Sequence, residues 1–234
     1  MEGLTYPMRI NKYLALNKYS TRKGGDELVK KGKVFINGRV AVLGDKVNQN
    51  DKVDVKSGAQ KKNYVYFAYN KPKGVITHSP QMGEKDIRQS VPLKNVFPVG
   101  RLDKASHGLI ILTDDGRVTD RLLNPKYTHD KEYVVSATNK ISPSFKNKLE
   151  SGVNIGDYKT KKCKVVGLSS HVFKIILTEG KKHQIRRMCS ALKNDVTDLK
   201  RIRIMNVHLG NLGDRQYREI SGDELQKFLK NIGL

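Results

Sequence analysis

The sequence predicts an α+β protein in two unequal parts, and three observations support this. Residues 58–63 lack apolar periodicity and have the small, polar composition of a linker, so we expect them to separate a module at 1–57 from a domain at 64–234. The first part has the pattern of two short helices and a hairpin. In the second part, strand patterns and helix patterns are interspersed without the regular order of a doubly wound fold.

The small part is predicted to hold two amphipathic helices, broken around residues 17–20. Its apolar residues at helical spacing are Ile10, Leu14, Leu28 and Val29. The second helix is expected to end at Gly32, just after two lysines that suit a helix C-terminus. Gly24 and Gly25 each cost about 1 kcal/mol relative to alanine inside a helix, so we expect this helix to begin after them. Asn37-Gly38 within 34–42 predicts a β-hairpin.

The larger part carries five strand patterns and four helix patterns. The strands are expected at 64–69, 108–112, 131–137, 161–166 and 172–177. The helices are expected at 117–123, 144–149, 184–192 and 223–229. Asp114 and Asp115 stand between a strand and a helix; neighbouring side chains on a strand point to opposite faces, so we interpret them as helix capping and not as a metal or acid–base pair.

The charge of the chain predicts a polyanionic partner. The 234 residues include 45 Lys or Arg and 23 Asp or Glu, a formal net charge of +22. In the small part, the candidate contacts with such a partner are Arg9, Lys12, Arg22, Lys23, Lys33 and Arg39. The alternative is a scatter of solvating side chains. A second basic cluster at 181–203 contains eight Lys or Arg and two Asp, and we expect it to contact the same polyanionic partner.

Other classes of protein are disfavoured by the composition. No apolar run reaches about 18 residues and the first residues lack a signal-peptide core, so we expect a cytoplasmic protein that does not bind membranes. Cys163 and Cys189 lack the spacing of a metal or disulfide framework and are expected to be reduced packing residues. A metal-dependent nuclease is disfavoured because no set of ligands converges.

The most informative motif is Arg101-Leu102-Asp103, which precedes the apolar run at 108–112. A single carboxylate placed ahead of a buried strand can serve as a nucleophile. Alone, such a triplet is more often a surface ion pair worth about 0–1 kcal/mol. Further motifs are therefore needed to decide between the two interpretations.

Motifs in both parts resemble known RNA-binding families. Residues 8–14, 20–23 and 29–38 resemble the alpha-L RNA-binding domain. Four motifs resemble, in order, the ribosomal RNA pseudouridine synthases of the RsuA and RluF type, nearest to the RluF branch: 71–75, 100–103, 131–135 and 180–188. This resemblance implies a mixed, mainly antiparallel sheet flanked by helices, an RNA isomerase that flips its target base, and no cofactor.

The resemblance also implies roles for single residues. Asp103 is expected to be the catalytic carboxylate, Tyr133 to stack under the flipped base, and Arg186 to form an ion pair with Asp103. From the residues alone, Tyr133 would be a core strand tyrosine. Further RNA contacts are expected at Lys71, Arg101, Lys182 and Arg187, of which Arg101 would occupy the space left by the extruded base. His107 is interpreted as a loop residue without a catalytic role.

These features together predict isomerisation of one uridine to pseudouridine in structured ribosomal RNA. The resemblance implies large-subunit (23S) RNA as the partner, with a transfer RNA anticodon arm left open as a second substrate, and a monomeric enzyme. The alternative is a non-catalytic RNA-binding or ribosome-assembly factor on the same fold. The presence of Asp103, Tyr133 and Arg186 together argues against that alternative.

Overall fold

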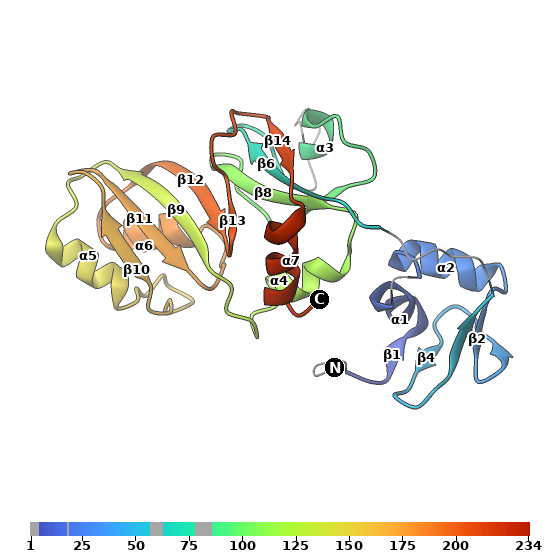
Figure 1. Ribbon diagram of the computed structural model, residues 1–234. Coiled ribbons are helices and arrows are strands. Elements are labelled where there is room, and N and C mark those ends of the chain that lie inside the picture. Colours follow the sequence, from blue (N-terminus) through green and yellow to red (C-terminus); the bar gives the residue numbers. More distant parts are fainter. Residues whose placement is uncertain (1–4, 18, 57–62, 78–85) are drawn as a thin grey trace. The chain divides into compact units, whose positions relative to one another are not determined.

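The computed structural model describes residues 5–17, 19–56, 63–77 and 86–234, and the chain divides into two compact units (Figure 1). The first unit comprises residues 1–64 together with 114–120, and the second comprises 65–113 and 121–234. The predicted linker at 58–63 lies outside the described residues, apart from Asn63. The exact ends of the two predicted domains therefore stay a prediction.

The first unit contains the two predicted helices and short strands. Its helices are α1 (Ile10–Leu16) and α2 (Arg22–Lys30). Its strands are β1 (Met8–Arg9), β2 (Val34–Ile36), β3 (Arg39–Val40), β4 (Lys46–Val47) and β5 (Val53–Val55). The order β3-β2-β5 forms one sheet, and β1 pairs with β4. The hairpin prediction is confirmed: Asn37 and Gly38 both have positive φ, as a tight turn between twisted strands requires.

Helix α2 corrects one expectation, because it begins before the two glycines. The hydroxyl of Thr21 caps the helix by accepting a hydrogen bond from the Gly24 backbone N–H at 3.1 Å. A Cβ atom at Gly25 would lie only 3.3 Å from the Asn11 Cα. Glycine thus allows α1 and α2 to approach closely, and this packing offsets its poor helix propensity. The helix ends as predicted, with Gly32 at a φ of +64°.

The second unit is built on one large, mainly antiparallel sheet. Its strands are β6 (Tyr66–Lys71), β7 (Phe97–Val99), β8 (His107–Thr113), β9 (Lys131–Ala137), β10 (Lys164–Gly167), β11 (Val172–Leu177), β12 (Val196–Ile204), β13 (Val207–His208) and β14 (Tyr217–Glu219). The main order is β10-β11-β9-β12-β8-β6-β14. Among the strands that the structure describes, the pair β8–β12 at the centre is parallel and the others are antiparallel.

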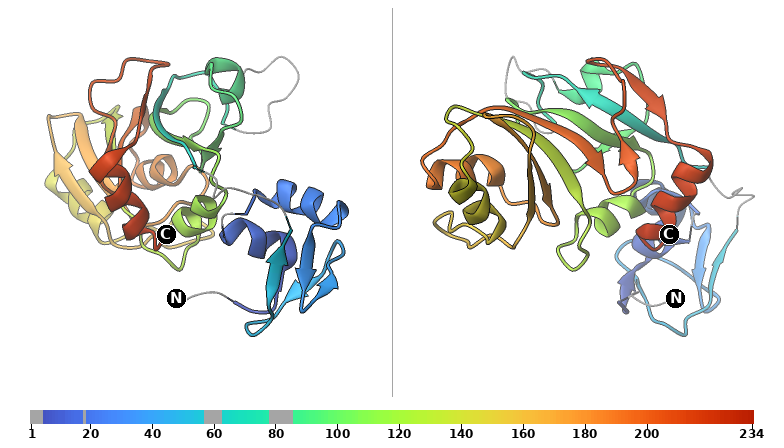
Figure 2. Two further views of the ribbon diagram at one scale, coloured as in Figure 1. Left: turned by 45° about the vertical axis from the view of Figure 1, so that its right-hand side comes forward. Right: turned by 60° about the vertical axis from the view of Figure 1, so that its left-hand side comes forward.

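Helices pack against parts of this sheet, and their apolar side chains form its core together with those of the strands. They are α3 (Ile87–Ser90), α5 (Pro143–Glu150), α6 (Gln184–Ala191) and α7 (Gly222–Asn231). Helix α4 (Arg117–Leu123) belongs to the first unit as far as Asp120 and to the second unit from Arg121. Figure 2 shows α5 and α6 at the end of the sheet formed by β10 and β11. Phe145 and Leu149 of α5 share one buried cluster with Ile185 and Met188 of α6.

Most predicted elements of the larger part are present, and one central strand was missed. The strands predicted at 131–137 and 172–177 match β9 and β11 residue for residue, as the helix at 117–123 matches α4. Strand β12 was not predicted. Asp115 accepts a hydrogen bond from the Arg117 backbone N–H at 3.1 Å and pairs with the Arg117 guanidinium at 2.6 Å, while capping by Asp114 and Asp115 stays a prediction. Within the described residues, no helix is long and apolar enough to cross a membrane.

Candidate active site

A cavity of about 310 Å³ opens in the second unit, and Asp103 and Tyr133 both line it. Its walls come from the loop after β7, the strands β9 and β12, and the loop that leads into α6. Leu177, Ile185 and Leu199 supply buried apolar surface. The volume lies at the lower end of the range of ligand pockets, about 300–1,000 Å³.

The loop that carries Asp103 is fixed by hydrogen bonds on both sides of that residue. The Thr77 hydroxyl accepts from the Leu102 N–H at 3.1 Å and donates to the Leu102 carbonyl at 2.8 Å. After Asp103, the Gly74 N–H donates to the Lys104 carbonyl at 2.8 Å. Because both flanking residues are tied to the 74–77 segment, the carboxylate has a defined position at the cavity, where its side chain is 37% exposed.

Lys71 is a structural residue, and the structure corrects its prediction as an RNA contact. The residue is fully buried, at 0% exposure, and its Nζ donates to the carbonyls of Pro72 at 2.8 Å and Val75 at 2.7 Å. Burial lowers the pKa of Lys71 to about 8, while the nearby charge of Asp103 acts in the opposite direction. An ammonium held inside this turn shapes the segment that supports the Asp103 loop and does not face RNA phosphates.

Four side chains project into the cavity from one face of the sheet. Tyr133 on β9 lies directly opposite Arg201 on β12 in the antiparallel register. Lys131 and Leu199 lie two residues away from these on their own strands, and side chains two apart on a strand share a face. All four line the cavity. This face therefore combines an aromatic ring, an apolar side chain and two cations.

The loop before α6 forms the opposite wall and is held by Glu179 and Gln184. The Glu179 carboxylate accepts hydrogen bonds from the Tyr158 hydroxyl at 2.7 Å, the Gln184 amide at 2.7 Å and the Lys161 backbone N–H at 3.0 Å. At the end of this loop His183 adopts a left-handed conformation, with a φ of +54°. Its Nε2 lies 3.3 Å from an Asp103 carboxylate oxygen.

Arg186 does not form its predicted ion pair with Asp103 in the part of the chain that the structure describes. Its guanidinium donates to the Val196 carbonyl at 3.0 Å and to the Ala105 carbonyl at 3.3 Å, with a longer 3.5 Å contact to the Ser106 hydroxyl. These bonds join α6 to the loop two residues beyond Asp103. Arg186 thus lies next to the Asp103 loop but does not line the cavity.

The other predicted RNA contacts of this unit differ in their surroundings. Arg101 and Lys182 are exposed and line the cavity. Arg187 instead pairs with Asp157 and donates to the Ile155 carbonyl, so its guanidinium is already engaged within the protein.

In the first unit, most of the predicted contacts lie at the surface. Five of the six are exposed, and Lys12 is half-buried. The exposed five are Arg9, Arg22, Lys23, Lys33 and Arg39. Of these, Arg39 forms an ion pair with Asp45 at 2.8 Å. Whether these side chains form one RNA-binding face stays a prediction.

The structure brings together residues that the sequence interpretation missed. The basic run at 181–203 was expected to continue the RNA track, but Arg201 is only 4% exposed and Arg203 pairs with Glu132 at 2.7 Å. The signal that could have found Arg201 is the strand β12, which was not predicted. Side chains alternate between the two faces of a strand, so Leu199 and Arg201 share the face that lines the cavity. Burial also lowers the pKa of Lys131 to about 8.

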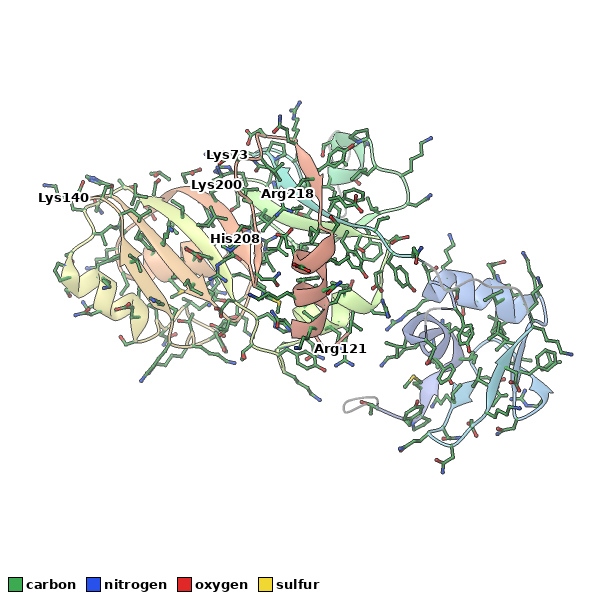
Figure 3. All side chains as sticks on the ribbon, in the orientation of Figure 1. Lys73, Arg121, Lys140, Lys200, His208 and Arg218 are labelled. Atoms are coloured by element: carbon green, nitrogen blue, oxygen red, sulfur yellow. The ribbon has the colours of Figure 1, made fainter. Side chains whose placement is uncertain are left out.

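His107 lies in a strand and not in a loop as predicted. It opens strand β8, and its Nε2 lies 3.1 Å from both carboxylate oxygens of Asp198 on β12. Asp198 also pairs with Lys73, whose position is marked in Figure 3. The cluster joins the 71–75 motif to the two central strands, which makes His107 a structural residue of the sheet and not a loop residue.

The comparison with family models decides which kind of site this is. Residues 65–191 match the RNA pseudouridylate synthase family, and residues 8–53 match the S4 domain. The chain belongs to the RNA pseudouridine synthase family. The enzyme therefore isomerises uridine in RNA, and its small N-terminal part is an RNA-binding domain.

The similarity of the synthase to relatives and to a solved structure extends over nearly its whole length. It is 38% identical over 233 residues to the dual-specificity RNA pseudouridine synthase RluF of Salmonella typhi, covering 96% of this chain and 79% of the relative. It is 32% identical to the ribosomal large subunit pseudouridine synthase B of Bacillus subtilis, covering 94% of each chain. A crystal structure of a pseudouridylate synthase matches with a TM-score of 0.68 at 26% identity, covering 96% of this chain and 99% of the other. The mixed, mainly antiparallel fold expected from the sequence is thus confirmed.

Proposed function

We propose that the synthase converts a uridine of large-subunit (23S) ribosomal RNA, flipped into the cavity, with Asp103 as its catalytic carboxylate. The observation that carries this proposal is the placement of Asp103. It is a carboxylate on a loop fixed by hydrogen bonds, and it lines a cavity that the aromatic side chain of Tyr133 also lines. A base that leaves the duplex needs a flat partner to replace its stacking, and Tyr133 provides one.

The chemistry needs one ionised carboxylate and no external reductant. The bond between ribose C1′ and base N1 breaks, the base turns, and C5 of the base forms a new bond to C1′. The C5 proton is then lost, and N1 gains a proton, so atoms and charge balance. Asp103 acts on the ribose, either as a nucleophile at C1′ or as a proton acceptor.

Arg186 is a positioning residue in this proposal. Its guanidinium bonds to the Ala105 carbonyl and approaches the Ser106 hydroxyl, so it holds the loop that continues from Asp103. His183 Nε2 lies 3.3 Å from a carboxylate oxygen of Asp103 and is a polar partner of it in the free protein. Entry of RNA would then exchange solvent around Asp103 for the ribose of the target nucleotide.

The RNA is held by exposed cations in both units. Arg101 and Lys182 at the cavity take the phosphates that flank the target. Arg101 also occupies the space that the flipped base leaves in the RNA. In the S4 domain, Arg9, Lys12, Arg22, Lys23 and Lys33 bind a neighbouring helix of the RNA through its phosphates.

We also propose that the enzyme works as a cytoplasmic monomer.

The relative from Bacillus subtilis is named for the large ribosomal subunit, which supports a large-subunit target here. The RluF relatives are named dual-specificity enzymes. This supports a second substrate, for which a transfer RNA anticodon arm is our candidate.

The experiment is a mapping of pseudouridine on unmodified RNA. Purified protein is incubated with large-subunit ribosomal RNA transcript, pseudouridine is labelled chemically, and primer-extension stops are mapped beside an Asp103→Asn control. One new stop that is absent from the control supports both the target and the role of Asp103. Product within tenfold of the parent in the Asp103→Asn lane would exclude that role. A stop on transfer RNA alone would show that transfer RNA, and not large-subunit ribosomal RNA, is the substrate.

A further inference from the structure

Arg201 is a buried cation whose charge has no carboxylate partner among the residues that the structure describes. Its Nε donates to the Leu109 carbonyl at 2.7 Å, and Nη1 makes a long 3.5 Å contact with the Arg101 carbonyl. The third nitrogen, Nη2, is buried and has no hydrogen-bond partner within the described parts of the chain. Buried charged groups are almost always paired, because an unsatisfied donor loses its hydration without compensation. The free donor therefore points to a group that arrives with the substrate.

The position of this donor is set by the centre of the sheet. Arg201 pairs with Tyr133 on one side and with Gly108 on the other. A Cβ atom at Gly108 would overlap the Arg201 backbone carbonyl, so glycine is what permits β8 and β12 to lie this close. The guanidinium is thus held by two neighbouring strands, opposite the aromatic ring, on the face that lines the cavity.

The cavity as a whole carries an excess of positive charge. Its two carboxylates are Asp103 and Glu179, and both oxygens of Glu179 already accept hydrogen bonds from the protein. Two of the cations, Lys131 and Arg201, are withdrawn from solvent on the sheet. Lys131 Nζ has the His129 carbonyl as its hydrogen-bond partner at 3.0 Å. An anionic or strongly polar ligand atom would complete this arrangement.

The burial of Arg201 indicates that its ligand is the base of the target nucleotide and not a phosphate. Exposed cations at the cavity, Arg101 and Lys182, are placed for phosphates, which stay hydrated and outside. Arg201 is 4% exposed and lies beside Leu199, which is 5% exposed. Burial at this depth suits a flat, uncharged ring with carbonyl oxygens at its edge better than a hydrated phosphate.

We propose that Arg201 donates through Nη2 to a ring carbonyl oxygen of the flipped uracil and stabilises the negative charge on the base when it leaves the ribose. The inference rests on the proposed role of Asp103 in opening the bond. When that bond breaks, the electron pair of C1′–N1 leaves with the base and spreads over N1, O2 and O4. The charge is lost again when C5 bonds to C1′, the C5 proton leaves and N1 is protonated. Lys131 is the second cation on this face.

The first test separates chemistry from binding and from folding. We expect Arg201→Met to slow single-turnover isomerisation about 10²–10³-fold, as loss of one preorganised donor to a developing anion does, with RNA affinity within threefold of the parent. The matched control is Arg203→Met on the same strand, which breaks a partly buried ion pair with Glu132 outside the cavity. Thermal unfolding is measured for both variants. A loss of rate in Arg201→Met no larger than in the control would overturn the proposal.

The second test varies the leaving base. Fluorine at C5 makes the departing base a more stable anion, so a transcript with 5-fluorouridine at the target needs less counter-charge. The loss caused by Arg201→Met, followed as disappearance of the starting nucleoside, is expected to be at least fivefold smaller on this transcript than on uridine. If the variant unfolds, Arg201→Lys carries the same comparison. An equal loss on both transcripts, or a loss of RNA affinity in place of rate, would overturn the assignment.

The outcome can be separated from the proposed function. All rates are referred to the parent on whichever RNA it converts, so a wrong target does not affect the comparison. Asp103→Asn is assayed alongside. If it retains activity, the proposed role of Asp103 fails, while the difference between the two bases still reports on Arg201.

Discussion

The two hydrogen bonds of the Thr77 hydroxyl give the sharpest test of how the site is built. Thr77→Val keeps the shape of the side chain but leaves the N–H and the carbonyl of Leu102 without their partner. Thr77 is 4% exposed, and a buried polar group left unsatisfied costs about 1–3 kcal/mol. Two such groups predict a loss of about 2–6 kcal/mol in the free energy of unfolding.

The same change is expected to disturb catalysis, since Leu102 directly precedes Asp103. A displacement of about 1 Å at a reacting group can cost on the order of 10²-fold in rate. We expect Thr77→Val to lower single-turnover isomerisation at least tenfold at a temperature where the variant stays folded. The assay combines chemical denaturation with pseudouridine formation under saturating enzyme.

Thr160→Val is the matched control for this variant. Thr160 is also 4% exposed, and its hydroxyl accepts one hydrogen bond from the Val153 N–H at 2.9 Å without lining the cavity. It should lose about 1–3 kcal/mol of stability and keep its rate. If Thr77→Val loses the predicted stability yet keeps the rate of the control, the argument that these bonds position Asp103 is refuted.

Three further outcomes are expected. Burial lowers the pKa of Lys71 to about 8 from 10.5, so between those pH values the unfolded chain binds more protons. The free energy of unfolding of the parent should therefore rise with pH relative to Lys71→Met, by at most about 1.4 kcal/mol per pH unit; parallel pH curves would contradict this. Gly108→Ala should destabilise far more than Gly210→Ala, because a Cβ meets the Arg201 backbone at the first site and open space at the second; equal unfolding midpoints in urea would refute the close packing of β8 on β12. With a net charge of +22, log affinity for RNA should fall linearly and steeply with log salt in filter binding, and a flat response would exclude the phosphate track.

Local sequence patterns predict much of the fold. The turn at Asn37-Gly38 and the alternation in β9 and β11 determine their own structure, so short windows predict them well. Helix α2 shows the limit of that reasoning. Its propensity disfavours glycine, but the close contact of Gly25 with Asn11 of α1 is a tertiary effect that no local window contains.

Residues of the candidate site could be predicted where each belongs to a short sequence motif. They could not be predicted where their place depends on contacts between segments distant in the sequence. Asp103 and Tyr133 were identified from their motifs, and the structure places both at one cavity. Arg201 and Thr77 were missed because their importance depends on packing. A basic residue in a run of basic residues indicates solvent exposure, and burial of Arg201 follows only from the place of β12 between β8 and β9.

The place of β12 also has a consequence for synthesis of the protein in the cell. This strand joins β10, β11 and β9 on one side to β8, β6 and β14 on the other, and it is made after all of these except β14. A growing chain that ends before Val196 already contains Asp103 and Tyr133, but it lacks the strand that joins their two halves of the sheet. Assembly of the cavity must therefore wait until β12 (Val196–Ile204) leaves the ribosome, and products truncated before Val196 would carry the RNA-binding domain without the complete cavity.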